Sequence, residues 1–309
     1  MAKGKRVNVE NTVNLWKPGR ARLQARVSGE FRAHRKRPKL GQHFLADRHF
    51  AERIVDALGD ISEKSVVEIG PGRGALTNTL AARAHRLIAI ELDRVLAAQL
   101  RMLFGRLGNV EIIEGDILSI DFSTVLGPRP GMNHPGIVHV PEKARLVGNL
   151  PYFITSDILL HLFQYHPYFE TIVIMVQQEV ADRIAARSGS NYGLLSATVQ
   201  LYAKVEKLFS VPPGAFNPPP KVHSAVLRLT IAPQMERLRV PEPEFIDFLK
   251  LCFGQKRKTL ANNLKSRFDS RLLAATLKKT GLQPGVRAEA VSLEKMAALF
   301  RGLTAAAAD

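Results

Sequence analysis

Residues Asn149-Leu150-Pro151-Tyr152 have the chemistry needed to hold the amino edge of an adenine. The Asn149 side-chain carbonyl and the Leu150 main-chain carbonyl can both accept hydrogen bonds from an exocyclic amine. Pro151 restricts the local φ so that these acceptors converge, and Tyr152 offers a face on which a base can stack. Taken alone, the same residues are more typical of a helix N-cap followed by a half-buried aromatic residue.

A glycine-rich segment forms a second candidate site. Gly70, Gly72 and Gly74 follow a short apolar run and precede a helical pattern. In that position glycines let the backbone approach a ligand closely, and the helix N-terminus attracts a negative group. The segment satisfies G-x-G-x-x-A, and Glu91 follows Gly70 by 21 residues, a spacing that nicotinamide-binding enzymes also show.

Three acidic residues favour S-adenosylmethionine over a nicotinamide as the cofactor. Glu68 directly precedes the turn, where it can balance the cofactor's cationic end. Glu91 ends a second apolar run and can bind both ribose hydroxyls, while Asp116 follows a third and can accept from the adenine amine. A nicotinamide would leave Asp116 and the Asn149 segment without a role. The plain alternatives are a surface acid at a strand end for Glu91 and an ordinary turn residue for Asp116.

These residues need a fold that brings several strand ends together. Short apolar runs predict strands at 65–69, 86–90, 110–113, 145–148 and 171–176. Helical periodicity predicts helices at 47–58, 75–84, 93–103, 156–163 and 178–186. Residues 198–209 and 222–229 are predicted to form a closing pair of strands. Repeated βα units indicate an α/β fold, a doubly wound, Rossmann-like sheet with helices on both faces.

Composition divides the 309 residues into three parts. Residues 1–38 predict a flexible basic arm, since the first 39 residues hold twelve Lys or Arg and only two acids. Its expected partner is a polyanion such as nucleic acid; a solvated tail and a transit peptide are the alternatives. Residues 39–232 are expected to form the S-adenosylmethionine-dependent methyltransferase domain. Several prolines then precede a smaller all-α domain over residues 241–304.

The helical domain carries a cationic segment. Residues 250–268 contain six Lys or Arg and no acid, and we expect contacts to nucleic-acid phosphates from Lys256, Arg257, Lys258 and Lys265. A solvated helix face is the alternative.

The single cysteine, Cys252, argues against a disulfide or a thiolate zinc cluster, and no apolar run is long enough to span a membrane. We therefore expect no metal, no membrane contact and a cytoplasmic setting.

Four segments in order make the chain resemble the rRNA adenine N6-dimethyltransferases. These segments are 39–45 (KLGQHFL), the 68–74 turn, 149–152 and 211–222 (VPPGAFNPPPKV), and the resemblance extends from about residue 40 to residue 303. The resemblance implies that the cofactor is contacted by His43, Leu45, Gly70, Gly72, Glu91, Asp116 and Asn149. It also pairs Phe216 with Tyr152 around the target base, with core packing as the alternative for Phe216.

One position departs from the pattern of that family. Where the family usually has Asn after Gly-Gln, this chain has His43. An imidazole can still donate a hydrogen bond to the methionine carboxylate of the cofactor, but we expect that contact to depend on pH.

Two branches of the family differ in substrate. Residues 253–260, followed by Asn263-Leu264 and Arg287-Ala288-Glu289, are similar to the C-terminal signature of the small-subunit branch. The resemblance implies dimethylation of N6 of two adjacent adenines near the 3′ end of small-subunit rRNA, by a monomer acting on the immature small subunit. The alternatives are a large-subunit methyltransferase of the macrolide-resistance type and a ribosome-assembly factor with a vestigial cofactor site.

Overall fold

The computed structural model describes residues 43–127 and 142–305. These residues form two compact units: one comprises residues 43–187 and 195–234, and the other residues 188–194 and 235–305. The basic arm predicted for residues 1–38 lies outside the described residues.

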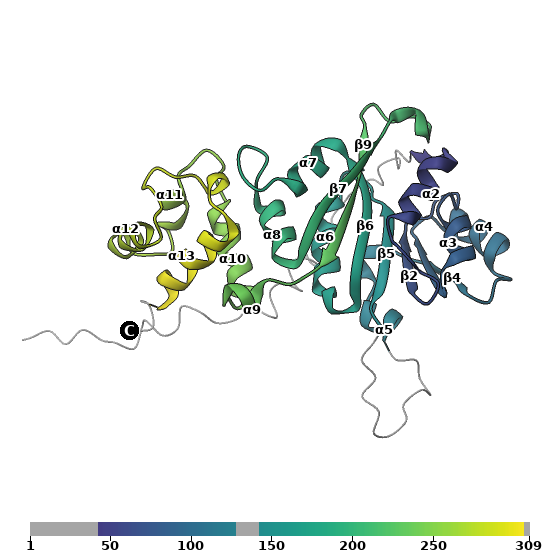
Figure 1. The fold of residues 1–309 in the computed structure, drawn as a ribbon, viewed down its shortest axis with the longest axis horizontal. Helices are drawn as coiled ribbons and strands as arrows, with labels where there is room; N and C mark the ends of the chain where they lie inside the picture. The colour runs from purple at the N-terminus through teal and green to yellow at the C-terminus, as the bar shows by residue number, and fades with distance from the viewer. Residues whose placement is uncertain (1–42, 128–141, 306–309) are drawn as a thin grey trace, which may run out of the picture. The chain divides into compact units, whose positions relative to one another are not determined.

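A seven-stranded sheet with the order β4-β3-β2-β5-β6-β9-β7 forms the centre of the first unit (Figure 1). Its strands are β2 (Ser65–Ile69), β3 (Arg86–Glu91), β4 (Val110–Glu114), β5 (Ala144–Asn149), β6 (Phe169–Gln177), β7 (Ala203–Val211) and β9 (Ser224–Ile231). The strands from β4 to β6 are parallel, whereas β9 pairs antiparallel with both β6 and β7. The strand order reverses at β2, and open α/β sheets bind ligands outside such a switch point.

Helices connect these strands, which confirms the predicted fold class. They are α2 (Arg48–Asp56), α3 (Thr77–Arg83), α4 (Arg94–Phe104), α5 (Phe122–Leu126), α6 (Thr155–Gln164), α7 (Gln178–Ala185) and α8 (Leu194–Tyr202). The carboxylates of Asp47 and Asp93 each accept hydrogen bonds from two backbone N–H groups and so cap α2 and α4. Helix α4 packs against β3 and β4, and α7 packs against β6, β7 and β9.

The prediction of a strand over residues 198–209 is wrong in its first part. Helix α8 continues to Tyr202, and β7 begins at Ala203. Most side chains of α8 are buried, so the helix shows no polar face in the sequence. The β-branched residues Thr198 and Val199 then favoured a strand. The short helix α5 lies outside the helices predicted from the sequence.

The second unit is helical, as predicted. It contains α9 (Met235–Leu238), α10 (Glu242–Cys252), α11 (Leu260–Leu264), α12 (Ser270–Lys279) and α13 (Leu293–Ala305). The rings of Phe245, Phe248 and Phe300 pack together in its core with centroids 5.4 to 6.1 Å apart. Residues 188–194 join this unit through a hydrogen bond from Gly189 N to Glu289 O, a connection that the sequence did not indicate.

Candidate active site

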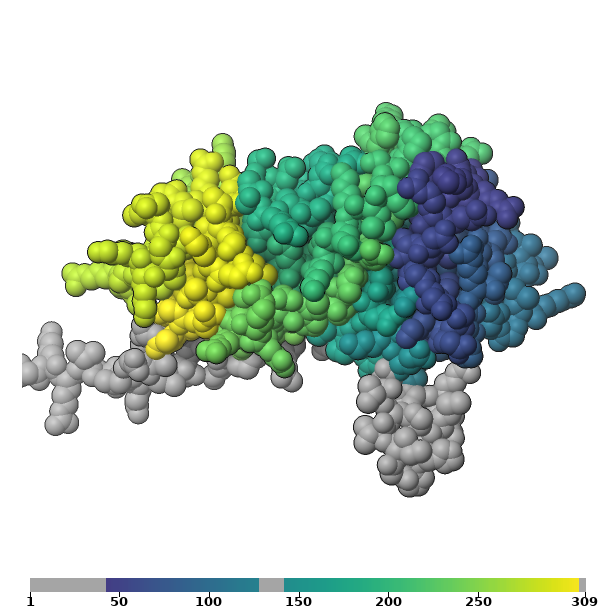
Figure 2. Space-filling view, viewed as in Figure 1, coloured from purple at the N-terminus to yellow at the C-terminus, as the bar shows by residue number. Residues whose placement is uncertain are grey.

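A short two-stranded ribbon holds the segment around Phe44 against the glycine turn. Strand β1 (Phe44–Leu45) pairs antiparallel with β8 (Phe216–Asn217). Figure 2 shows the surfaces of the two regions in contact, purple for the segment that begins at β1 and green for the segment that leads into β9. The Phe44 ring lies 2.9 Å from the position that a Cβ of Gly72 would take, and the Arg73 guanidinium lies 4.6 Å from the centre of that ring.

The glycine turn has the backbone conformation that only glycine adopts readily. Gly70, Gly72 and Gly74 have φ values of +64°, +59° and +85°. A Cβ on Gly70 would meet no neighbouring atom closer than Asn149 O, at 3.9 Å. The turn therefore runs close to the end of β5 and leaves space at Gly70 for a ligand to approach the backbone, as an S-adenosylmethionine site requires.

Two buried carboxyl groups border the turn. The Glu91 carboxylate accepts hydrogen bonds from Gly72 N at 3.0 Å and from Asp93 N at 2.9 Å, so it ties the end of β3 to the turn. The Glu68 carboxyl accepts from the Thr77 hydroxyl at 2.8 Å. Burial raises the pKa of Glu68 to about 8, with Glu91 adding to the rise and Thr77 opposing it. Glu68 is therefore largely protonated at neutral pH and can balance a cation only after losing that proton.

Asn149, at the end of β5, is oriented by the residue before β1. Its Nδ2 donates to His43 O at 3.3 Å, which leaves Oδ1 as the acceptor end of the amide. His43 Nδ1 lies 2.7 Å from Pro218 O. Because a carbonyl only accepts, Nδ1 carries the proton, and Nε2 of the neutral ring is an acceptor. The donation to a methionine carboxylate expected of His43 thus requires the imidazolium form.

Leu150, Pro151 and Tyr152 form the turn after β5. Leu150 is buried, and its N–H donates to Met175 O on the neighbouring strand at 3.0 Å. The Tyr152 hydroxyl lies 2.8 Å from the Ser224 hydroxyl at the start of β9. These two bonds fix the turn that follows Asn149 relative to β6 and β9.

The side chains of Phe216 and Leu45 lie in the hydrophobic core. Phe216 is 3% exposed and Leu45 is 8% exposed, and both belong to one cluster that also contains Ile54 of α2. In this conformation Phe216 packs as a core residue, the alternative that the sequence left open, and stacking on a base would require the ring to move outward. A contact between Leu45 and a cofactor would use its backbone.

Asp116 follows β4 at the same edge of the sheet as the glycine turn and Glu91. Its side chain is exposed, and one carboxylate oxygen accepts from Leu118 N at 3.0 Å, which caps the short 3-10 helix Ile117–Ser119. Because β2, β3 and β4 are adjacent and parallel, their carboxyl ends meet at this edge.

Several contacts that shape this site were not predicted. They involve Phe44, Thr77, Pro218 and Ser224. Phe44 lies inside the segment that carried the resemblance, so its position was the available signal. Pro218 lies inside another such segment, 211–222. Thr77 and Ser224 contact Glu68 and Tyr152, which lie 9 and 72 residues away in the sequence, and no local pattern reveals these two contacts.

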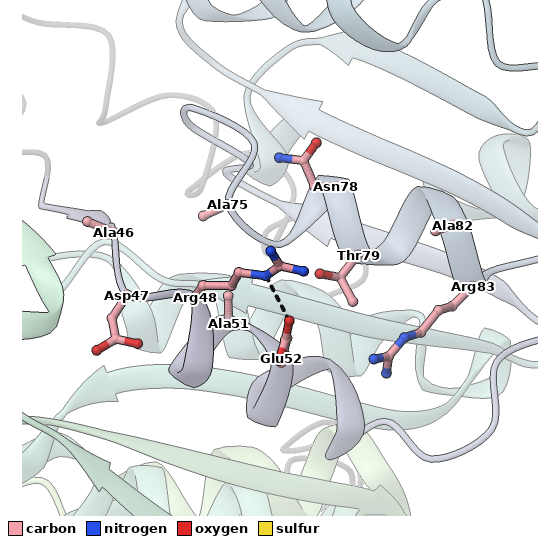
Figure 3. Close-up of a pocket in the computed structure, with 10 residues that line it drawn as sticks. All are labelled: Ala46, Asp47, Arg48, Ala51, Glu52, Ala75, Asn78, Thr79, Ala82 and Arg83. Carbon is pink, nitrogen blue, oxygen red and sulfur yellow. Dashed lines mark hydrogen bonds and ion pairs between the residues drawn. The ribbon is translucent and has the colours of Figure 1, made fainter.

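A separate cavity of about 560 Å³ lies between α2 and α3 (Figure 3). An ion pair joins Arg48 Nε to Glu52 Oε1 across 2.9 Å at this cavity, and Arg83 borders it from α3. None of the predicted cofactor residues lines it. Among its lining residues, Asn78 contacts the glycine turn directly, because its Nδ2 donates to Gly74 O at 3.0 Å.

The predicted phosphate-binding residues are exposed in the second unit. Lys256, Arg257 and Lys258 lie in the loop between α10 and α11, not on a helix as expected. Lys265 follows α11 and borders a hollow of about 550 Å³ that Lys278 also lines. Within residues 43–127 and 142–305, no cluster of three or more His, Cys, Asp or Glu could hold a metal, and no helix is long and apolar enough to cross a membrane.

Comparison with known proteins gives consistent matches. A family model described as ribosomal RNA adenine dimethylase matches residues 33–305. A ribosomal RNA small subunit methyltransferase A from Koribacter versatilis is 60% identical over 269 residues, which cover 87% of this chain and 94% of the relative. A protein of the same name from Acidobacterium capsulatum is 50% identical over 288 residues, 93% of this chain and 96% of the relative.

Two crystal structures share the fold over most of the chain. A dimethyladenosine transferase from Plasmodium falciparum has a TM-score of 0.65 and 27% identity, covering 83% of this chain and 96% of that one. The 23S rRNA methyltransferase ErmE has a TM-score of 0.62 and 27% identity, covering 84% of this chain and 99% of that one.

Proposed function

The chain belongs to the ribosomal RNA adenine dimethylase family, and we propose that it uses S-adenosylmethionine to dimethylate N6 of two adjacent adenines near the 3′ end of small-subunit rRNA. The observation that carries this proposal is the meeting of His43, the glycine turn and Asn149 at the switch point of the sheet. The small-subunit branch is favoured by the 60% and 50% identical relatives, because identity to the 23S enzyme is 27%.

The residues at the sheet edge suit this cofactor. The turn from Gly70 to Gly74 would hold it, with Glu91 at its ribose and Asp116 at its adenine. When bound, S-adenosylmethionine supplies a methyl group on a positively charged sulfur. Glu68 would offset positive charge beneath the turn once ionised, and the imidazolium of His43 would bind a carboxylate.

Asn149 and Leu150 would activate the acceptor by position. The lone pair of an adenine N6 is delocalised into the ring, so the nitrogen is a poor nucleophile. Hydrogen bonds from both N–H groups to Asn149 Oδ1 and Leu150 O favour a pyramidal nitrogen whose lone pair points at the methyl group. Tyr152 would support the base by stacking. The proton leaves to water after transfer, so no side chain needs to act as a general base first.

The target adenine must be unpaired or turned out of its stack to reach Asn149. We propose that the cations at Lys256, Arg257, Lys258 and Lys265 bind the rRNA backbone. We propose that the protein acts as a monomer on the immature small subunit, in the cytoplasm.

Methyl transfer to separated ribosomal subunits tests the proposal. Immature 30S and 50S particles are incubated with the protein and methyl-labelled S-adenosylmethionine, and we expect label in the 30S rRNA only. Asn149→Ala should lower the rate by about 10²- to 10³-fold, as loss of one positioned active-site hydrogen bond does elsewhere. Label in 50S alone would establish the large-subunit alternative. Binding to 30S without transfer would indicate an assembly factor.

A further inference from the structure

Among the described Phe and Tyr residues, one ring projects into solvent. Phe153 is 58% exposed, whereas every other described Phe and Tyr is buried or half-buried. Burying such an apolar side chain is favourable, so its exposure leaves a stabilising contact unmade. Single exposed apolar residues are nevertheless common. The location of Phe153 therefore decides whether its exposure has a function.

Phe153 lies in the tight turn between β5 and α6, four residues after Asn149. Pro151 O accepts hydrogen bonds from Ile154 N and from the Thr155 hydroxyl, both at 3.2 Å. The preceding Tyr152 is held at its hydroxyl by the bond to β9. The backbone on both sides of Phe153 is thus fixed, and the ring is presented by a rigid turn. Ordering it on a ligand costs little conformational entropy.

The surface beside this turn suits a nucleotide. The bond between Tyr152 and Ser224 places the turn next to the segment that enters β9, where Lys221, Val222 and His223 are all exposed. Lys221 can bind a phosphate, and Val222, 44% exposed, extends the apolar surface. The one carboxylate on the first turn of α6, Asp157, is also exposed. The negative charge of Asp157 disfavours a phosphate next to α6. We therefore expect the RNA backbone to run past Lys221, on the other side of the turn.

Turning the target base out of its stack leaves the neighbouring base without a stacking partner. This happens when the target adenine swings out of the stacked strand to reach Asn149. An aromatic ring beside the pocket can replace that partner, as aromatic residues do in proteins that bind single-stranded RNA. Tyr152 is tied to β9 through its hydroxyl, whereas Phe153 is open to solvent.

We propose that Phe153 stacks on the nucleotide adjacent to the target adenine and so selects an unpaired, splayed strand as substrate. This inference rests on the proposed function and adds a specificity residue to it.

Kinetics on immature 30S particles test the inference with the full chain. We expect Phe153→Ala to lower kcat/KM by about 5- to 150-fold, the range that loss of one base stack implies, mainly through KM. Phe153→Trp should retain the wild-type value, whereas Phe153→Leu, apolar but not aromatic, should behave like the alanine variant. Affinity for S-adenosylmethionine and thermal stability should not change in any of the three. Met102→Ala, at a residue that is 84% exposed on α4, is the matched control for loss of a surface apolar side chain.

Two results would overturn the inference while the proposed function stands. One is a Phe153→Ala enzyme within twofold of wild type, and the other is equal activity of the leucine and tryptophan variants, which would indicate a general apolar contact such as one with a ribosomal protein. The wild-type reaction reports on the proposed function separately. If it places no label on 30S particles, that function fails, and the inference fails with it.

Discussion

At the scale of single residues, the direction of the Asn149 amide depends on a backbone atom 106 residues away. Because His43 O accepts from Nδ2, a half-turn of the amide would lose that bond. It would also point a donor at the adenine amine, which is itself a donor. The main chain at His43 therefore selects the orientation in which Asn149 can accept. The His43 side chain is fixed in turn by Pro218 O, so three segments share one hydrogen-bond chain.

Glu68 gives the stability of the protein a specific dependence on pH. Its pKa in the folded protein is about 8, against an ordinary value of 4.5, so between these values the folded state binds more protons than the unfolded state. The free energy of unfolding should therefore decrease as pH rises through this window, by up to about 1.4 kcal/mol per pH unit from this group.

Urea denaturation at several pH values between 5.5 and 8 checks this effect. Glu68→Gln keeps an acceptor for the Thr77 hydroxyl but cannot ionise, so its free energy of unfolding should decrease less steeply with pH than that of the wild type. Glu63→Gln, at an exposed position, is the control and should follow the wild type. Parallel curves for wild type and Glu68→Gln would show that the buried carboxyl does not titrate in this range.

At the scale of elements, the ribbon of β1 and β8 connects two parts of the site, the glycine turn and the end of β5. Ala46 N and Asp47 N both donate to Ala215 O, at 2.8 and 3.1 Å, directly after β1. Through this ribbon Phe44 reaches the glycine turn and His43 reaches the end of β5. The ribbon thus fixes the spacing between the cofactor-binding turn and the acceptor-binding loop.

Gly72→Ala should damage this arrangement in two separable ways. The left-handed φ costs about 1–2 kcal/mol for alanine, and the added Cβ would lie 2.9 Å from the Phe44 ring. We expect a lower free energy of unfolding and weaker binding of S-adenosylmethionine. When Phe44 is also replaced by Ala, the part of the loss that comes from the clash with its ring should disappear. A double-mutant cycle of Gly72→Ala and Phe44→Ala measures that part. Gly189 has a φ of +83°, and a Cβ added there would meet no neighbouring atom within 4 Å. The Gly189→Ala variant therefore measures the cost of the left-handed backbone without a steric contact. A cycle without coupling would refute the contact.

The local parts of this arrangement could be predicted from the sequence, and the long-range parts could not. The glycine turn and the acids at the strand ends follow apolar runs, so their context was visible. Strands β1 and β8 have two residues each, too few to show a period. The burial of Phe216 and the bond from His43 to Pro218 depend on the packing of segments 175 residues apart. Helix α8 was misassigned because burial on several sides removes the amphipathic pattern.

At the scale of the whole molecule, the chain separates chemistry from a second, cationic surface. The proposed methyl-transfer groups lie in the unit with the sheet, and the loop of Lys256, Arg257 and Lys258 lies in the helical unit. Contacts to phosphates carry no sequence information, whereas the groups around Asn149 read a base edge. Affinity and selection of the target should therefore respond to different substitutions.

Replacing Lys256, Arg257 and Lys258 together by Gln should weaken binding to small-subunit rRNA at every salt concentration. If each cation neutralises one phosphate, the slope of log affinity against log salt should become shallower by about 2 to 3. Affinity for S-adenosylmethionine should not change. Lys295→Gln, an exposed cation on α13, is the control and should leave the slope near the wild-type value. An unchanged slope in the triple variant would place the phosphate contacts elsewhere.

Mass spectrometry of small-subunit rRNA from cells with and without the gene tests the central claim most directly. Two neighbouring adenines near the 3′ end should each carry two N6-methyl groups when the gene is present. Both should lack these groups when it is deleted, and restoring Asn149→Ala instead of the wild type should leave them unmodified. Identical modification of those adenines with and without the gene would contradict the account.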